Sequence, residues 1–206
     1  VEPAGAACLK ASLEAGEVTT VSKINTIADG TAVQTPGDKL FPYLQANVDH
    51  VITVDDSELT LSFLDMAENH KMIVENSGLL TVAALKHLDF KGKKVVSVLS
   101  GGNMDVLTMA TVVQNGLMQR DRIFTVSVML PDKPGQLAAV SSLIAKEQGN
   151  VIKLEHNVFA NVNRTAGVEL TITLESFGTE HKDQIIKALE AAGYCPVITK
   201  TNGIYM

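Results

Sequence analysis

The chain has 206 residues, of which 46% are hydrophobic and 19% charged, and its formal net charge at pH 7 is −6. This length can bury one domain core or two small ones. The negative charge argues against a nucleic-acid or anionic-membrane partner, because both need clustered Lys and Arg. No apolar run approaches the roughly 20 residues of a membrane helix, and no basic-plus-apolar signal segment is present.

The cysteines and the first residues indicate the setting of the chain. Cys8 and Cys195 lie too far apart in the sequence to suggest a disulfide framework, so we expect a reducing, cytoplasmic location. The chain opens on Val1 with no methionine, and a helix is expected almost at once, over residues 5–15. Such a beginning is expected for a piece of a larger protein, produced by expression, processing or proteolysis.

Strands and helices are expected to alternate over residues 1–118. Asp56 and Glu58 supply N-cap and first-turn acids to one helix. The run at residues 95–99 is apolar at nearly every position, which is typical of a strand covered on both faces. The expected elements are a strand at 48–54, a helix at 56–70, a buried helix at 77–88, a strand at 95–99 and a helix at 104–115 with Gly116 as its C-cap. This alternation predicts an α/β layer architecture.

A long stretch without sustained periodicity, TIADGTAVQTPGDKLF at residues 26–41, lies between these elements. Loops of this length in a compact domain are usually functional or disordered. The apolar side chains of Ile27, Ala28, Ala32 and Val33 argue against disorder. A functional loop is therefore the preferred interpretation.

Residues 123–206 have a self-consistent pattern of their own. Residues 123–130 alternate between apolar and polar side chains, and Pro134 is suited to the first turn of a helix that runs to about residue 147. The further expected elements are strands at 151–159 and 167–175, a helix at 180–192 closed by Gly193, and a strand at 194–199. The order βαββαβ implies an antiparallel sheet with two helices on one face.

The stretch VLSGGNMD, residues 98–105, places small and polar residues where an expected strand ends. Open α/β sheets bind ligands at the carboxyl ends of their strands, and paired glycines let a planar ring or a phosphate approach the backbone. The hydroxyl of Ser100 can bond a ring nitrogen. The alternative is a tight connection between strand and helix in which Asn103 is only an N-cap.

Five motifs occur in an order that resembles one enzyme family: VEPAGAACLKASLEAG, TIADGTAV with PG soon after, VDHVITVDDSEL, VLSGGNMDV and VMLPDKPGQLAAV. Together they resemble the C-terminal part of a pyridoxal-phosphate-dependent threonine dehydratase (threonine ammonia-lyase) with one C-terminal ACT regulatory domain. The resemblance covers essentially all 206 residues and is specific to the wider serine/threonine dehydratase group. Serine racemase shares the first four motifs but lacks the ACT module.

The resemblance implies an α/β fold in two parts. Residues 1–118 correspond to the C-terminal part of a fold-type II (tryptophan synthase β-like) catalytic domain. Residues 123–206 correspond to a ferredoxin-like βαββαβ ACT regulatory domain. The full-length parent is expected to use pyridoxal 5'-phosphate.

By the same resemblance, three stretches supply the cofactor site. Ser100 would bond the pyridine nitrogen, and a neutral hydroxyl there limits the electron-sink strength of the ring, which suits β-elimination. Glu75 matches the acidic residue near the ring, although the family more often reads Glu-Gly-Ala-Gly where this chain has Asn76 and Ser77. Alternatively, Glu75 is only the first-turn acid of a buried helix. The other implied cofactor contacts are Gly101, Gly102 and Asn103 at the pocket edge, and Ala28 and Gly30 on the ring face.

A cation site found in several relatives would use Glu2, the backbone carbonyl of Ala6 and a third position, which here is Cys8. A cysteine is a poor ligand for Mg²⁺ or Ca²⁺, so whether a divalent or monovalent cation binds stays open. The alternative is that Glu2 only caps the N-terminus of the first helix.

The resemblance also implies what the chain lacks. Such enzymes hold the cofactor as a Schiff base on a lysine and seat its phosphate in a glycine-rich loop, and both lie N-terminal to the equivalent of Val1. Lys23, Lys39, Lys71 and Lys94 lie in expected loops or at element ends, and the five histidines show no metal-ligand spacing and are expected at the surface. The chain alone is therefore expected to be inactive and not to retain the cofactor.

The ACT resemblance implies an amino-acid effector site shared by two copies of the chain. A helix start offers backbone N–H groups to a carboxylate, and the partner copy supplies the start of its second strand. The effector-binding residues are expected to be Pro134, Gly135, Gln136 and Leu137 in one copy, and Asn150, Val151 and Ile152 in the other. The alternative is a dimerisation module with an empty site.

The sequence thus predicts a fragment of L-threonine ammonia-lyase, which deaminates threonine to 2-oxobutanoate and ammonia by pyridoxal-phosphate-dependent β-elimination. We expect threonine or serine as substrate, isoleucine or valine as allosteric effector, a role in isoleucine biosynthesis, and a homodimer or homotetramer. Two alternatives stay open. One is a stand-alone amino-acid-sensing or dimerisation protein, and the other is half of a serine dehydratase or serine racemase-like enzyme.

Overall fold

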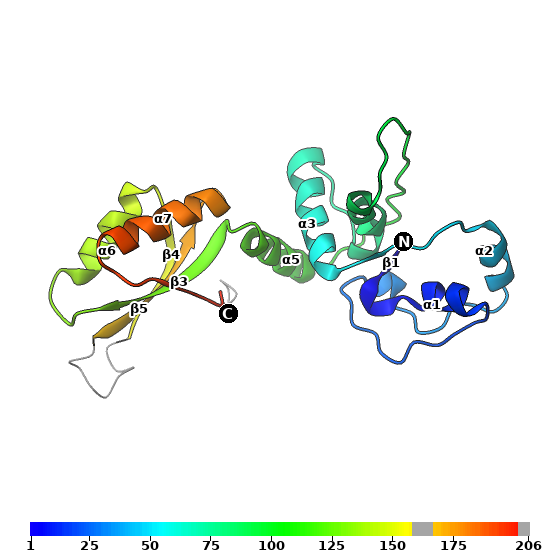
Figure 1. Ribbon diagram of the computed structural model, residues 1–206, viewed down its shortest axis with the longest axis horizontal. Helices are drawn as coiled ribbons and strands as arrows, with labels where there is room; N and C mark the ends of the chain where they lie inside the picture. Colours follow the sequence, from blue (N-terminus) through cyan, green and yellow to red (C-terminus); the bar gives the residue numbers. More distant parts are fainter. Residues whose placement is uncertain (158–166, 202–206) are drawn as a thin grey trace. The chain divides into compact units, whose positions relative to one another are not determined.

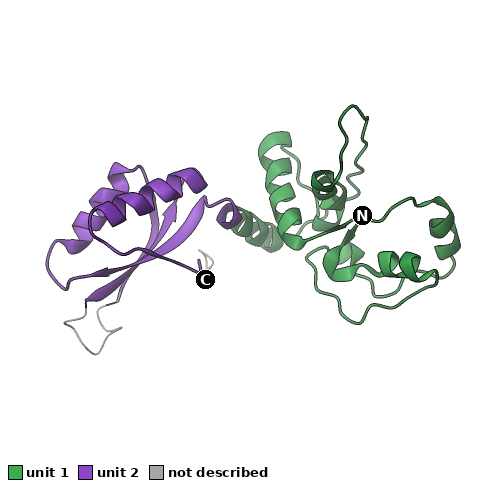
Figure 2. Cartoon of the chain, viewed as in Figure 1, with its two compact units in different colours: residues 1–116 green, residues 117–206 purple. Residues whose placement is uncertain are grey.

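The computed structural model describes residues 1–157 and 167–201. The chain divides into two compact units, Val1–Gly116 and Leu117–Met206 (Figure 2). Each unit has its own hydrophobic core. In the described part of the chain, no helix combines the length and the apolar character that crossing a lipid bilayer requires.

Unit 1 is built mostly from short helices joined by long connections (Figure 1). Its strands β1 and β2 form one short parallel pair, in which Glu2 lies opposite Thr53. In chain order the elements are β1 (Glu2–Pro3), η1 (Ala4–Ala6), α1 (Cys8–Ala15), η2 (Asp29–Thr31), α2 (Phe41–Asn47), β2 (Thr53–Val54), α3 (Asp56–Asp65), the π-helix η3 (Met66–His70), η4 (Asn76–Leu79), α4 (Leu80–Ala83), η5 (Ala84–His87) and α5 (Val106–Gln119).

The central helix of unit 1 is α3, and its start is fixed by a capping box. The side chain of Asp55 accepts the backbone N–H of Glu58, and the Glu58 carboxylate accepts the backbone N–H of Asp55 at 2.9 Å. The N-cap is thus Asp55, one residue before the position expected from the sequence. The helix then buries Leu59 and Phe63 in the core of the unit. The expected helix over residues 56–70 is confirmed, with its last turn widened into η3.

Three expectations for unit 1 are wrong. Of the strand expected at 48–54, only Thr53–Val54 forms a strand. Residues 95–99 form no strand, and the side chains of Val96 and Val98 are 87% and 65% exposed, because none of the described strands pairs with this segment. Gly116 is no C-cap, because α5 continues to Gln119. A Cβ at Gly116 would lie 2.6 Å from Cδ1 of Leu64. The glycine is therefore needed for the close packing of α5 against α3.

Unit 2 confirms the expected βαββαβ order and antiparallel sheet. Helices α6 and α7 cover one face of the sheet (Figure 1), whose strands lie in the order β4-β5-β3-β6. Strand β4 is described as far as Asn157, and the last residues of the strand expected at 151–159 lie outside the described part. The elements are β3 (Ile123–Leu130), α6 (Gln136–Lys146), β4 (Asn150–Asn157), β5 (Val168–Glu175), α7 (Thr179–Ala191) and β6 (Val197–Thr199).

The alternation expected in residues 123–130 sets the core of unit 2. The fully buried side chains of Val126 and Val128 lie in one cluster with Ile144 of α6 and Ile185 of α7. Burying a side chain of this kind contributes about 1.5–3 kcal/mol. The helices therefore pack on the face of the sheet that the sequence pattern identifies.

The residues that lead into β3 are fixed to the start of α7. Asp121 has a positive φ of 55°, and its carboxylate accepts the Thr179 hydroxyl at 2.7 Å and pairs with Lys182 at 2.9 Å. Ser176 donates its hydroxyl to the Asp121 carbonyl. Burial by itself would raise the pKa of Asp121, but the bonds from Lys182 and Thr179 outweigh it and hold the pKa below its ordinary value.

We expect Asp121→Asn to lower the free energy of unfolding by about 1–2 kcal/mol at neutral pH, since Asn tolerates the positive φ but cannot pair with Lys182. The lowered pKa means that the stabilisation is present above the unfolded-state pKa of about 4 and is lost as the pH falls through the folded-state pKa. Urea unfolding from neutral pH to about pH 3 should show the difference shrinking. Asp183→Asn, on the exposed side of α7, serves as the control, and a difference that persists in acid would contradict the assignment.

Candidate functional site

The loop at residues 26–30 is held in place by the first residue of α3. Asp56 accepts the Thr26 hydroxyl at 2.7 Å with one carboxylate oxygen and the Ile27 backbone N–H at 3.0 Å with the other. The Thr26 hydroxyl in turn accepts the backbone N–H of Ala28 at 3.1 Å. From the other side, the Asn76 amide donates to the Ile27 carbonyl at 3.0 Å. The loop is therefore fixed at both flanks before Gly30.

A second close approach joins Glu75 to the Ser-Gly-Gly stretch. The backbone N–H of Glu75 donates to the Gly101 carbonyl at 3.1 Å. A Cβ built at Gly101 would lie 2.3 Å from Oε1 of Glu75. Only glycine leaves room for the carboxylate here, so residue 101 and Glu75 depend on each other.

Gly30 lies near the same Glu75 carboxylate. A Cβ at Gly30 would lie 3.0 Å from the hydroxyl oxygen of Ser77 and 3.8 Å from Oε1 of Glu75. Three stretches that are distant in the sequence therefore meet around one carboxylate. The structure brings together Gly30, Glu75 and Gly101 among the residues expected at the cofactor site.

The other expected cofactor contacts differ in exposure. Ser100, Gly102 and Asn103 are exposed. The Ala28 side chain is fully buried in the core of unit 1, so any contact it makes with a ligand is through its backbone. Asn103 is not the helix cap of the alternative interpretation, because Asp105 accepts the Thr108 backbone N–H at 2.9 Å. This bond lowers the pKa of Asp105.

Two buried polar atoms at the site lack a hydrogen-bond partner among the described residues: Oδ1 of Asn76 and Oγ of Ser77. Both residues are at least nine-tenths buried. An unpaired buried polar group costs about 1–3 kcal/mol. These are also the two positions where the chain departs from the family's Glu-Gly-Ala-Gly pattern, so the departure adds polar groups next to Gly30 and Glu75.

Glu2, the expected cation ligand, caps helix α1. Its two carboxylate oxygens accept the backbone N–H groups of Leu9 and Lys10, each at 2.8 Å. Burial and the neighbouring Glu2 carboxylate raise the pKa of the Cys8 thiol. In the described ranges, no three His, Cys, Asp or Glu side chains gather as a metal site would require. A cation at Glu2 and the Ala6 carbonyl stays a prediction.

The expected effector residues of unit 2 lie at opposite ends of its sheet. Glu175 pairs with both Asn150 and Ile123, so β4 begins at the end of the sheet where β3 begins. Helix α6 begins after the other end of β3, with Gly135 as its N-cap at φ 90°. Seven residues of strand span about 23 Å. Asn150 and Gly135 of one copy are therefore too far apart to hold one amino acid.

The start of α6 differs in detail from the expectation. Pro134 lies before the N-cap and not in the first helical turn. A Cβ at Gly135 would meet nothing within 4 Å, but the positive φ makes any other residue strained there. Gly135 is required by its backbone conformation as well as by any carboxylate brought to the helix start.

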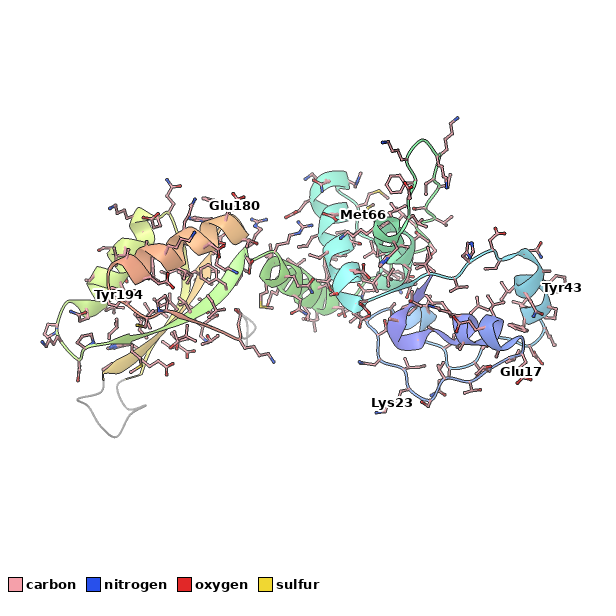
Figure 3. The ribbon with its side chains drawn as sticks, viewed as in Figure 1. Glu17, Lys23, Tyr43, Met66, Glu180 and Tyr194 are labelled. Carbon is pink, nitrogen blue, oxygen red and sulfur yellow. The ribbon has the colours of Figure 1, made fainter. Side chains whose placement is uncertain are left out.

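A pocket of about 520 Å³ lies between the end of α6 and the start of α7, lined by residues that include Lys146, Phe177 and His181. His181 is buried, against the expectation that all histidines lie at the surface. Its Nδ1 accepts the Phe177 backbone N–H at 3.0 Å, and its Nε2 donates to the Glu147 carbonyl at 2.6 Å. Glu180, at the start of α7, is exposed (Figure 3). Sequence periodicity missed the pocket, because these bonds depend on tertiary packing.

Comparison with known proteins identifies both units. Residues 1–101 match the family model of the pyridoxal-phosphate dependent enzymes, and residues 124–193 match that of the ACT domain. Residues 1–101 are therefore similar to the pyridoxal-phosphate dependent enzyme domain, and an ACT domain follows them. The expected fold class is confirmed.

Within the pyridoxal-phosphate-dependent enzymes, the similar proteins include L-threonine ammonia-lyases and a threonine deaminase. The L-threonine ammonia-lyase of Geobacter sulfurreducens is 36% identical over 203 residues, which are 97% of this chain and 50% of that protein. The L-threonine ammonia-lyase of Thermotoga maritima is 34% identical over 89% of this chain and 46% of that protein. The processed form of threonine deaminase isoform 2 from Solanum lycopersicum matches 55% of this chain and 34% of that chain, at 27% identity and a TM-score of 0.50. The chain spans about half the length of the curated relatives it matches.

Pyridoxal phosphate fits the residues at this site. Gly30 and Gly101 present backbone without side-chain atoms, which a planar ring needs for close approach. The Oγ of Ser77, which has no hydrogen-bond partner among the residues described, and the exposed hydroxyl of Ser100 are of the kind that bonds a heteroaromatic ring or its polar substituents. Lys23, one of the lysines considered above, lies in the exposed loop after α1 (Figure 3).

We expect Asn76→Ala to loosen the loop at residues 26–30, because it removes the bond to the Ile27 carbonyl. Hydrogen exchange at the Ile27 and Ala28 amides should become about five- to tenfold faster, as loss of roughly 1 kcal/mol predicts. Ser77→Ala is the matched control, since its hydroxyl has no partner among the described residues. Equal exchange in both variants would show that Asn76 does not hold the loop.

Proposed function

We propose that the complete protein is an L-threonine ammonia-lyase located in the cytoplasm, and that this chain contributes part of its catalytic domain, residues 1–118, and its regulatory domain, residues 123–206. The observation that carries the proposal is the convergence of Gly30, Glu75 and Gly101 at one point. Relatives of that name match nearly the whole chain. The reaction removes the hydroxyl group and the α-amino group of threonine and yields 2-oxobutanoate and ammonia.

Each site residue has a proposed part in this reaction. Pyridoxal phosphate, when bound, supplies the electron sink that β-elimination needs. The Ser100 hydroxyl would donate to its ring nitrogen, and Gly101, Gly102 and Asn103 would form the edge of the pocket beside it. The Glu75 carboxyl group would lie beside the ring, and its close approach to Gly101 limits its position.

On the opposite flank, the backbone of Ala28 and Gly30 would border the ring face. Asp56 and Asn76 hold this loop, so the chain orients one wall of the site by its own hydrogen bonds. This support is independent of any ligand. It gives a reason why the TIADG and VDDSEL motifs occur together in the chain.

The ACT domain is proposed to bind a small aliphatic amino acid between two copies of the chain, isoleucine or valine first. The N–H groups at Gly135, Gln136 and Leu137 would receive the carboxylate. The apolar side chain would contact Val151 and Ile152 of the partner copy. Because these two sets lie at opposite ends of one sheet, the site is complete only in a dimer or a larger homo-oligomer.

Ser100→Ala in the complete protein should lower 2-oxobutanoate formation from threonine by about one to two decades. Ser100 is exposed in this chain, but its hydrogen bond to the ring nitrogen would be covered by the bound cofactor, and loss of such a bond costs about 1–3 kcal/mol. Cofactor absorbance and threonine turnover are measured together, with Ser22→Ala in an exposed loop as the control. The present chain by itself should form no product. An unchanged rate and an unchanged cofactor affinity in the Ser100 variant would contradict the assignment.

The shared effector site can be tested by mixing two variants of this chain, Gly135→Ala and Val151→Asp. In calorimetry with isoleucine, valine, threonine and serine at millimolar concentrations, each variant alone should bind no effector. A one-to-one mixture should regain about a quarter of the wild-type stoichiometry, because half of the dimers are mixed and one of their two sites is intact.

Thermal unfolding of each variant checks that it is folded, since a residue other than glycine is strained at the positive φ of position 135. Binding that does not return on mixing would mean that the two sets do not form a joint site. No binding by the wild-type chain would leave the ACT domain only an assembly role.

A further inference from the structure

The cavity between the end of α6 and the start of α7 is formed within a single copy of unit 2. Its volume of about 520 Å³ lies within the ~300–1,000 Å³ that is typical of small-molecule sites. Its walls are residues 146–148 at the end of α6 and residues 177–181 and 184 at the start of α7. Helix α6 has 11 residues and so spans about 16 Å. The cavity is therefore distinct from the Gly135 helix start of the same copy, where the effector carboxylate is expected.

An exposed aromatic ring with a fixed orientation lies at this cavity. The side chain of Phe177 is 78% exposed, yet its ring is stacked on that of His181, with ring centroids 4.7 Å apart and planes inclined by 17°. His181 is itself fixed, because its ring bonds the Phe177 backbone N–H and the Glu147 carbonyl. A ligand ring can therefore stack on Phe177 without first having to order it.

The charged side chains that line the cavity have both signs. Lys146 brings an ammonium group, whereas Glu147 and Glu180 bring carboxylates. The amides of Gln148 and Gln184 add donors and acceptors. This set fits a ligand that carries one positive and one negative group. It does not fit a polyanion such as a nucleotide, because the two carboxylates would repel it.

We propose that this cavity binds an α-amino acid with an aromatic side chain, one per copy of the chain. The ligand ring stacks on Phe177, the ligand carboxylate pairs with Lys146, and the ligand ammonium group pairs with the carboxylates of Glu147 and Glu180. This site differs from the effector site under Proposed function in two ways. It needs no second copy, and it takes an aromatic side chain in place of a small aliphatic one.

The wall of the cavity is bonded to the residues that lead into β3. The backbone N–H of Ser176 donates to the Arg122 carbonyl at 2.8 Å, and the Thr179 hydroxyl donates to the Asp121 carboxylate at 2.7 Å. Phe177 lies between these two anchored residues in the sequence. A ligand that holds Phe177 therefore also stabilises the connection from α5 to β3 against local opening.

Calorimetry on this chain tests the site with phenylalanine, phenylethylamine and phenylpropanoate. Phenylalanine should bind at one site per chain, and the other two compounds, which each lack one charged group, should bind at least about tenfold more weakly. Phe177→Ala should weaken phenylalanine binding at least about tenfold, whereas Phe177→Tyr keeps the ring and should bind as the wild type does. Both variants should stay folded, because the side chain is exposed. Hydrogen exchange at the Ser176 and Phe177 amides should slow when phenylalanine is bound.

Two control variants separate this site from the shared effector site. Gly135→Ala should bind phenylalanine as the wild type does, and so should Val197→Ala, on a 60% exposed valine of β6 outside the cavity. Isoleucine binding should be the same in Phe177→Ala as in the wild type, so failure of the effector proposal and failure of this one give different results.

The proposal is overturned if phenylalanine does not bind at millimolar concentrations, or if Phe177→Ala binds it as well as the wild type. Loss of phenylalanine binding in Gly135→Ala would also overturn it, because the ligand would then occupy the shared site. Equal affinity for phenylethylamine or for adenosine monophosphate would contradict the assignment to an amino acid.

Discussion

The candidate site depends most on the two hydrogen bonds that the Asp56 carboxylate accepts from the loop at residues 26–30. Asp56 is the first residue of α3, whose start is fixed by the Asp55–Glu58 capping box and whose side chains fill the core of unit 1. One oxygen holds Thr26 and the other holds Ile27. Because Asp56 is fixed by a helix that packs in the core, its hydrogen bonds also fix the loop at residues 26–30, which has little regular structure of its own. Gly30 reaches Ser77 and Glu75 because of this chain of bonds.

The parts of the fold that could be predicted from the sequence are those whose covering layer lies within the chain. The alternation at Phe124, Val126 and Val128 is confirmed because α6 and α7 supply the buried side. The apolar run at residues 95–99 follows an equally clear pattern, but the structure leaves Val96 and Val98 exposed. A hydrophobic pattern reports that a segment is normally covered. It does not report whether the covering layer belongs to the same polypeptide.

Only part of the candidate site could be predicted from the sequence, because some of its hydrogen bonds join residues that are distant in the sequence. The motifs placed Glu75, Gly30 and Gly101 together through family resemblance, and in the structure a Cβ added at either glycine would lie within 4 Å of Oε1 of Glu75. The role of Asn76 could not be read from its position, because its bond to Ile27 joins residues 49 positions apart. His181 was missed in the same way, since both of its ring bonds are to backbone atoms brought near by packing.

The register of the sheet in unit 2 sets a condition on any ligand that needs both expected effector sets. The pairing of β3, β4 and β5 separates Gly135 from Val151 by the length of a sheet, so a ligand that needs both must lie between copies. A second copy can meet this condition because the two sets lie at two different ends of one domain, and two copies side by side can bring one end of each together.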